Sequence, residues 1–123
     1  MILVDTSIWI GHFRRADPTL SDLLEAGEVL THPLVVGELA CGSLPAREEV
    51  LGLLQRLPAA PSASDTEALH FIERHRLMGR GIGYIDVHLL AAAALAEGAR
   101  LWTAEARLAA AASRLSLAYD PAH

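Results

Sequence analysis

Short apolar runs alternate with longer segments of helical pattern along the chain. Residues 1–4 are all apolar and too few for a helix, so they predict a buried strand. Similar short runs predict strands over residues 28–31, 100–103 and 115–119. Helical segments separate most of these strands, which is the order expected of an α/β fold. We therefore predict a parallel sheet that is covered by helices on both faces.

Capping residues and helix breakers place the predicted helices between the strands. Thr6 or Ser7 can cap the first helix, and Ser64 with Glu67 has the capping-box pattern at the start of another. Proline at first turns and glycine after last turns mark further boundaries. The helices predicted from these signals cover residues 7–13, 19–26, 33–42, 45–57, 65–78, 84–97 and 104–113.

Length and composition favour one domain that spans residues 1–123. Apolar residues make up 52% of the chain and charged residues 20%, which allows one packed core and excludes a mainly disordered protein. We read no repeat, long linker, signal peptide or apolar run of about 20 residues, so we expect a soluble protein of the cytoplasm. The single cysteine, Cys41, cannot form an internal disulfide and is predicted to be buried among small apolar neighbours.

The charge balance limits how the chain can engage nucleic acid. The net charge is −5, and all ten basic residues are arginine. A domain of this charge repels a polyanion, so binding would need a local arginine patch or a divalent cation. Arg74, Arg76 and Arg80 cluster around the start of a glycine-rich break, and Arg14 with Arg15 forms a second pair. Either group can hold RNA phosphates or serve as a solvated helix face.

Four carboxylates stand where such a sheet would bring them together. Asp5 and Glu105 follow predicted strands, and ligands bind beyond the carboxyl ends of the strands in an open parallel sheet. Glu38 and Asp86 lie in helical segments that are otherwise apolar, where an unpaired charge is costly. We predict that the four side chains share a cation.

An oxygen-only donor set indicates Mg²⁺ or Mn²⁺ as that cation. Such an ion lowers the pKa of a bound water and offsets charge that develops on a phosphodiester, so the hypothesis is hydrolysis of phosphate esters. Each acid also has a structural explanation. Asp5 could be a turn residue, and Asp86 could favour the dipole of a helix N-terminus. Glu38 could pair with an arginine, and Glu105 could be a solvated acid in a first turn.

The acids recur within four short segments of characteristic sequence. These are residues 1–7, which end in Asp5-Thr6-Ser7, the short helix around Glu38, residues 83–91 around Asp86, and residues 101–105, which end in Glu105. In order and spacing, these segments resemble the PIN-domain ribonucleases, in particular the VapC toxins of bacterial toxin–antitoxin pairs. The resemblance covers essentially the whole chain.

The resemblance implies a PIN-like fold with a sheet of four or five parallel strands. It implies an endoribonuclease that depends on Mg²⁺ or Mn²⁺, serves as the toxin of a toxin–antitoxin pair and forms a homodimer. It also implies a cognate VapB antitoxin, whose tail would occupy the active-site groove. The family's catalytic positions fall on Asp5, Glu38, Asp86 and Glu105, its firmest metal ligands on Asp5 and Asp86, and its site-shaping hydroxyls on Ser7 and Thr103.

Two positions depart from the family pattern. Glu105 stands where the family usually has aspartate, so its carboxylate reaches one methylene farther. Arg107 stands where many relatives carry a further acid, which would weaken a second metal site. These departures leave an alternative open, namely a catalytically weak relative that acts by binding or sequestering a partner.

Two other classes that place acids at strand ends do not fit the chain. A phosphoacceptor receiver domain needs a lysine to contact the phosphoryl group, and this sequence has none. A phosphatase of the Asp-x-Asp type needs an acid two residues after Asp5, where Ser7 stands.

Overall fold

Three short parallel strands form the sheet at the centre of the molecule. The computed structural model describes residues 1–121 of the chain. β1 (Ile2–Val4) lies between β2 (Val29–Leu30) and β3 (Arg100–Trp102), and both neighbours run parallel to it. The predicted α/β architecture is confirmed, and β1, whose carboxyl end leads to Asp5, occupies the central position.

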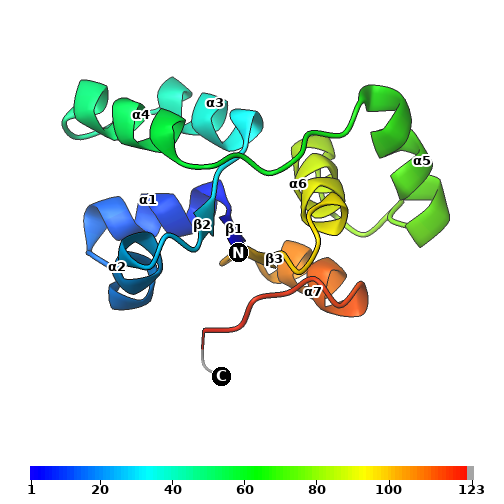
Figure 1. Cartoon of the computed structure of the whole chain (residues 1–123). Coiled ribbons are helices and arrows are strands. Elements are labelled where there is room, and N and C mark those ends of the chain that lie inside the picture. The colour runs from blue at the N-terminus through cyan, green and yellow to red at the C-terminus, as the bar shows by residue number, and fades with distance from the viewer. Residues whose placement is uncertain (122–123) are drawn as a thin grey trace.

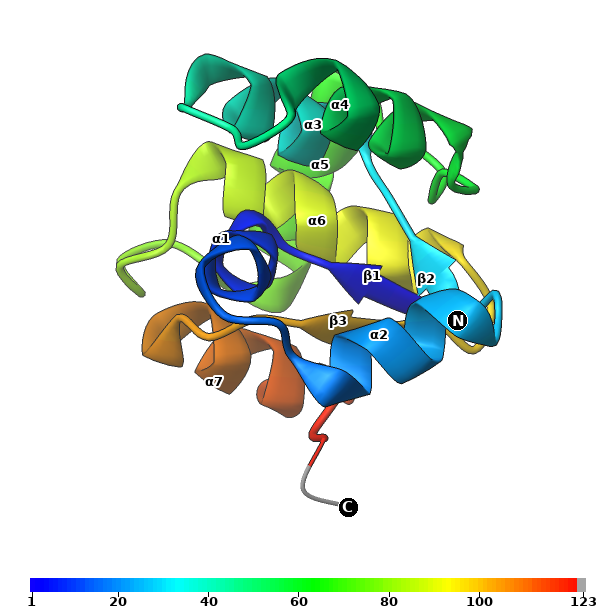
Figure 2. The same cartoon turned by 90° about the vertical axis from the view of Figure 1, so that its left-hand side faces the viewer.

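Helices surround this sheet. α1 and α2 lie on one side of it, α5, α6 and α7 lie on the other, and the α3–α4 pair lies across one end (Figure 1). The turned view shows the α3–α4 pair lying over α1 and α6 (Figure 2). The bounds are α1 Thr6–Arg14, α2 Pro18–Glu25, α3 Pro33–Cys41, α4 Arg47–Arg56, α5 Asp65–His75, α6 Tyr84–Leu95 and α7 Ala106–Arg114.

The core lies where the sheet meets the helices. Leu3 pairs in register with Leu30 and Leu101, and all three side chains are buried. Leu90 of α6 and Leu20 of α2 belong to the same buried cluster. Burial of a leucine side chain contributes about 1.5–3 kcal/mol, so packing fixes the short strands more firmly than their few ladder hydrogen bonds do.

The sheet has three strands rather than the four or five that were expected. Residues 115–119, predicted to be a final strand, contact β3 only through an isolated bridge between Leu101 and Ala118. Ser116 adopts a left-handed backbone with a φ of 59°, which turns the chain directly after α7. A second isolated bridge, between Thr31 and Ala59, lies beyond the β2 end of the sheet.

Left-handed residues also move two helix ends away from their predicted positions. Ala46 has a φ of 46°, so α4 begins at Arg47 rather than at Pro45. Arg76 has a φ of 53° and ends α5 at His75, three residues before the predicted end.

Two side chains behave differently from their sequence interpretation. Asp5, and not Thr6 or Ser7, is the N-cap of α1. Cys41 is exposed rather than buried, because it is the last residue of α3 and the helix ends there beside Gly42. Within residues 1–121, no helix has both the length and the hydropathy that a membrane crossing requires.

The predicted capping box at the start of α5 is confirmed and yields a stability test. The Ser64 hydroxyl accepts from the Glu67 amide at 3.1 Å, and the Glu67 carboxylate accepts from the Ser64 amide at 2.8 Å. We expect Ser64→Ala to lower the free energy of unfolding by about 0.5–2 kcal/mol in chemical denaturation. Ser62→Ala, in the same connection, is the matched control and should change it little. Equal stability of the two variants would contradict the capping role.

Candidate active site

Four acidic side chains line one pocket of about 410 Å³. Asp5 follows β1, Glu38 lies on α3, Asp86 lies in the first turn of α6, and Glu105 is the N-cap of α7. Thr6, Ser7, Ile10 and Leu89 complete the lining. The fold therefore brings together the four acids that the sequence placed on four separate elements.

Asp5 is held more tightly than the other acids. It is only 3% exposed, although it carries a carboxylate. Oδ1 accepts from the amides of Ser7 at 3.0 Å and Ile8 at 3.3 Å, and also from the Ser7 hydroxyl. Oδ2 accepts from the Thr103 hydroxyl at 2.6 Å. These donors fix the orientation of the carboxylate and compensate for the water it loses on burial.

The hydroxyls of Ser7 and Thr103 join Asp5 to the loop that follows β3. The Ser7 hydroxyl also accepts from the Ala104 amide at 3.0 Å, and the Thr103 hydroxyl also accepts from the Glu105 amide at 3.0 Å. The two hydroxyl oxygens are 3.4 Å apart. The two residues predicted to shape the site therefore set the distance between β1 and the backbone that carries Glu105.

Glu38 and Asp86 each have one local hydrogen bond. The Thr6 hydroxyl donates to Glu38 Oε1 at 2.9 Å and so connects α1 with α3. The Gly83 amide donates to Asp86 Oδ2 at 3.0 Å, which places this carboxylate against the N-terminal turn of its own helix. Each carboxylate keeps an oxygen for which no hydrogen bond is found within the described part of the chain.

The acids share one electrostatic field. Burial raises the pKa of Glu105 above its ordinary value, and the nearby negative charges raise it further; they belong, in decreasing order of effect, to Asp86, Asp5 and Glu38. The charges of the three other acids therefore act on Glu105 across the shared pocket. The raised pKa therefore supports the view that the four side chains form one group.

The donor set fits a hard divalent cation. Carboxylate oxygens are the ligands that Mg²⁺ and Mn²⁺ prefer, and the buried, hydrogen-bonded Asp5 provides a fixed ligand at the base of the pocket. Within residues 1–121, however, no three of the His, Cys, Asp and Glu side chains lie close enough together to form a ready-made metal centre. The acids surround a pocket rather than converge on one point, so a cation would need waters or side-chain rotation to complete its shell.

The arginines predicted to hold RNA do not border this pocket. Arg74 lines a different pocket between α5 and α6, and Arg80 Nε donates to the carbonyl of Arg76 at 2.8 Å. Arg107 packs against Gly81, where a Cβ would come within 2.4 Å of its guanidinium. Gly81 has a φ of +76°, so glycine suits this position for two reasons.

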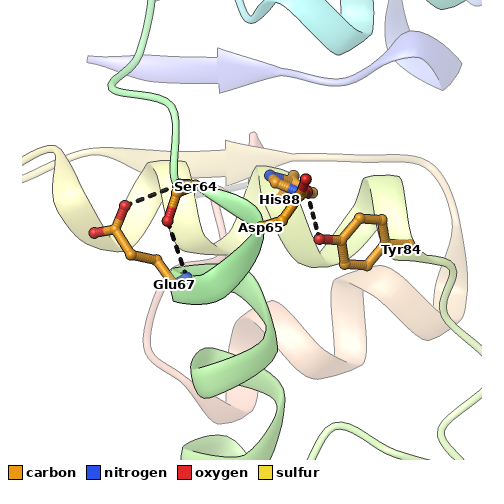
Figure 3. Close-up of polar contacts among 5 residues, drawn as sticks. All are labelled: Ser64, Asp65, Glu67, Tyr84 and His88. Atoms are coloured by element: carbon orange, nitrogen blue, oxygen red, sulfur yellow. Dashed lines mark hydrogen bonds and ion pairs between the residues drawn. The ribbon is translucent and has the colours of Figure 1, made fainter.

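A second polar cluster supports the helix that carries Asp86. Tyr84 and His88, both on α6, approach the same oxygen of Asp65 at the start of α5 (Figure 3). The tyrosine hydroxyl donates at 2.7 Å, and His88 Nε2 lies at 3.4 Å. The Tyr84 hydrogen bond lowers the pKa of Asp65, and the same bond raises the pKa of Tyr84. These contacts tie the first turns of α5 and α6 together next to Asp86.

Sequence reasoning missed two of these features. Thr6 was interpreted only as a helix cap, although its hydroxyl contacts Glu38 across 32 residues of sequence. The only signal was its position between Asp5 and Ser7. The Asp65 cluster had no sequence signal beyond the placement of Asp65 at a helix start.

Comparison with known proteins identifies the family to which this chain belongs. The sequence matches the PIN domain over residues 2–114, and the chain is therefore a member of the PIN-domain family. This confirms the resemblance found in the sequence. A crystal structure of PAE2754 from Pyrobaculum aerophilum matches with a TM-score of 0.60 and 18% identity, over 89% of this chain and 78% of that one. At this identity the match supports the fold alone.

Two relatives of higher identity are named as ribonucleases. Ribonuclease VapC32 of Mycobacterium tuberculosis strain CDC 1551 / Oshkosh is 49% identical over 118 residues, which are 96% of this chain and 95% of the relative. Ribonuclease VapC32 of strain ATCC 25618 / H37Rv matches with the same identity and coverage.

The raised pKa of Glu105 predicts how the protein without metal responds to pH. The folded protein binds this proton more tightly than the unfolded chain, so ionised Glu105 opposes folding above its folded pKa. We expect Glu105→Gln to raise the melting temperature in EDTA at about pH 7 by roughly 1–3 °C, a small effect because solvent screens this side chain. The gain should disappear below about pH 4, where the carboxyl group is protonated in both states. Glu97→Gln is the exposed control, and an equal effect of both variants would contradict the shared field.

Proposed function

We propose that the chain is an endoribonuclease that depends on Mg²⁺ or Mn²⁺ and acts as the toxin of a type II toxin–antitoxin pair. The single observation that carries the proposal is the pocket lined by Asp5, Glu38, Asp86 and Glu105. The name of the Mycobacterium tuberculosis relatives, ribonuclease VapC32, supports RNA as the substrate and a VapB-type antitoxin as the partner. A homodimer that acts in the cytoplasm belongs to the same proposal.

Asp5 and Asp86 would hold the cation, with Glu38 and Glu105 completing the charged wall. Asp5 is suited to this role because its orientation is fixed by hydrogen bonds from Ser7 and Thr103. The bound cation would supply positive charge against the phosphodiester and make a nearby water easier to deprotonate. Without such a cation, the acidic lining would repel an RNA phosphate, because like charges in one site repel strongly.

Hydrolysis breaks one phosphorus–oxygen bond of the RNA backbone; the water supplies a hydroxyl group to the phosphorus and a proton to the leaving oxygen. The carboxylates orient the reacting groups, and Ser7 and Thr103 keep Asp5 in place during the step. The contact between Thr6 and Glu38 holds α3 at the edge of the pocket. The chain's own contribution is therefore a rigid acidic frame around the site of the phosphate.

Metal binding should stabilise the fold. A ligand that binds only the folded state at 100 times its Kd adds about 2.7 kcal/mol to the free energy of unfolding. We expect Mg²⁺ or Mn²⁺ to raise the melting temperature of the protein and Asp86→Asn to remove most of that rise. Asp22→Asn, an acid on α2 outside the pocket, is the matched control. An equal rise in all three proteins would place the cation elsewhere.

RNA cleavage tests the activity itself. Groups that stabilise charge at a reacting centre contribute roughly 10²–10³ in rate, so we expect Asp5→Asn and Asp86→Asn each to lower the cleavage rate by about 100-fold or more. The wild-type protein should cleave RNA with Mg²⁺ or Mn²⁺ and lose this activity in EDTA. Cleavage at the wild-type rate by both variants would reject the assignment. Absence of cleavage by every form, with retained binding of a partner, would favour sequestration instead.

A further inference from the structure

A second pocket opens directly beside the acidic one. Its volume is about 370 Å³, and it shares two of its lining residues, Ile10 and Glu38, with the acidic pocket. It lies between the end of α1 and the segment where α3 passes into the connection to α4. A molecule that crosses from one pocket to the other would therefore pass over Ile10 and Glu38.

The walls of this second pocket are largely apolar. Ile10 is 41% exposed, so its side chain offers apolar surface at the boundary between the two pockets. Phe13 lines the pocket and stacks on Trp9, with ring centroids 5.9 Å apart and an angle of 28° between the planes. Trp9 is buried in the core, so the phenylalanine ring has a rigid support. Leu39 and Leu44 add further apolar surface.

One basic side chain lines the same pocket. Among the side chains that line the two pockets within residues 1–121, Arg14 is the only basic one. It is exposed at the end of α1, and arginine recognises phosphate through bidentate hydrogen bonds. The pocket thus combines a rigid aromatic wall, aliphatic surface and a phosphate-binding group, and it adjoins the acids.

We propose that this pocket binds one nucleotide of a single-stranded RNA, next to the phosphate at the acidic site. The base would lie against Phe13 and Ile10, and Arg14 would bind the phosphate of that nucleotide. Single-stranded RNA is recognised through unstacked bases on aromatic side chains and phosphates on arginine. A volume of about 370 Å³ suits a ligand of this size. The inference rests on the proposed ribonuclease function and names the part of the chain that selects sequence beside the cut.

Ser43→Trp tests the pocket without disturbing the core. Ser43 is an exposed residue of the pocket wall, so an indole there would fill the space while the buried residues stay unchanged. We expect this variant to bind a random-sequence single-stranded RNA pool about 10- to 100-fold more weakly in fluorescence anisotropy, the range for loss of one stacked base. Its preference for bases beside the cleavage point should also become weaker. Ser113→Trp, on the exposed part of α7, is the matched control and should behave like the wild-type protein.

Arg14→Gln tests the phosphate contact independently. The logarithm of the RNA binding constant falls linearly with the logarithm of salt concentration, and each lost phosphate contact reduces the slope by about 0.7 for a single strand. We expect this reduction for Arg14→Gln and not for Arg15→Gln, whose arginine lines a different pocket. Melting temperatures close to wild type would show that all four variants fold.

The outcomes separate this inference from the proposed function. Weaker RNA binding by Ser43→Trp and a reduced salt slope for Arg14→Gln support the nucleotide pocket, even if the wild-type protein binds RNA without cleaving it. Wild-type cleavage with unchanged binding and base preference in both variants would overturn the pocket and leave the ribonuclease assignment intact. Unchanged RNA binding with loss of a co-purifying antitoxin would assign the pocket to a protein partner and overturn the proposal. A wild-type protein that neither binds nor cleaves RNA would overturn both proposals.

Discussion

Repulsion among the carboxylates is the constraint that the rest of the site must meet. Asp5, Glu38, Asp86 and Glu105 line one pocket, and the pKa of Glu105 is raised first by burial and then by the negative charges of the other three. Such a group does not stabilise a fold, so the surrounding structure must hold it together at some energetic cost. Proteins tolerate repulsion of this kind where a ligand compensates for it, which supports the proposal that the acidic pocket holds a cation.

The β1–α1 junction shows how the fold meets that constraint. Asp5 directly follows the central strand and caps α1, so its carboxylate fixes the start of this helix as well as lining the pocket. Ser7 and Thr103 then connect the same carboxylate to the loop after β3. A cap residue in a buried position cannot easily change its rotamer, so the Asp5 carboxylate has a fixed orientation in the pocket.

The sequence predicted the elements that patterning and capping control. Alternation of short strands with capped helices determined the architecture, and acids at strand ends met because parallel strands share one carboxyl edge. Left-handed backbone conformations could not be predicted from the side-chain pattern. Left-handed Ala46 and Arg76 ended or delayed helices whose side-chain pattern continued, and left-handed Ser116 prevented residues 115–119 from forming a regular strand.

Contacts between residues far apart in the sequence could not be predicted from the hydrophobic pattern either. Arg74, Arg76 and Arg80 are adjacent enough in sequence to suggest a patch, but which pocket they border depends on the packing of α5 and on the loop after it. Arg14 carried a weaker sequence signal, yet the placement of α1 against α3 sets it in the pocket beside the acids. Local spacing predicts which residues share an element, and tertiary packing decides which elements share a site.

Under the proposed ribonuclease function, the two adjoining pockets would contribute to RNA binding in different ways. An overall charge of −5 opposes approach of a polyanion, and the acidic pocket adds to this repulsion, which a bound cation would reverse locally. In the neighbouring pocket, a base would stack on Phe13 and pack against Ile10, and these contacts do not depend on net charge. Arg14 adds a positive charge to the neighbouring pocket, and Glu38 lies at the boundary between the two pockets. Under the two proposals, base contacts in one pocket would therefore select the RNA, and the phosphate would enter the other pocket only with a bound cation.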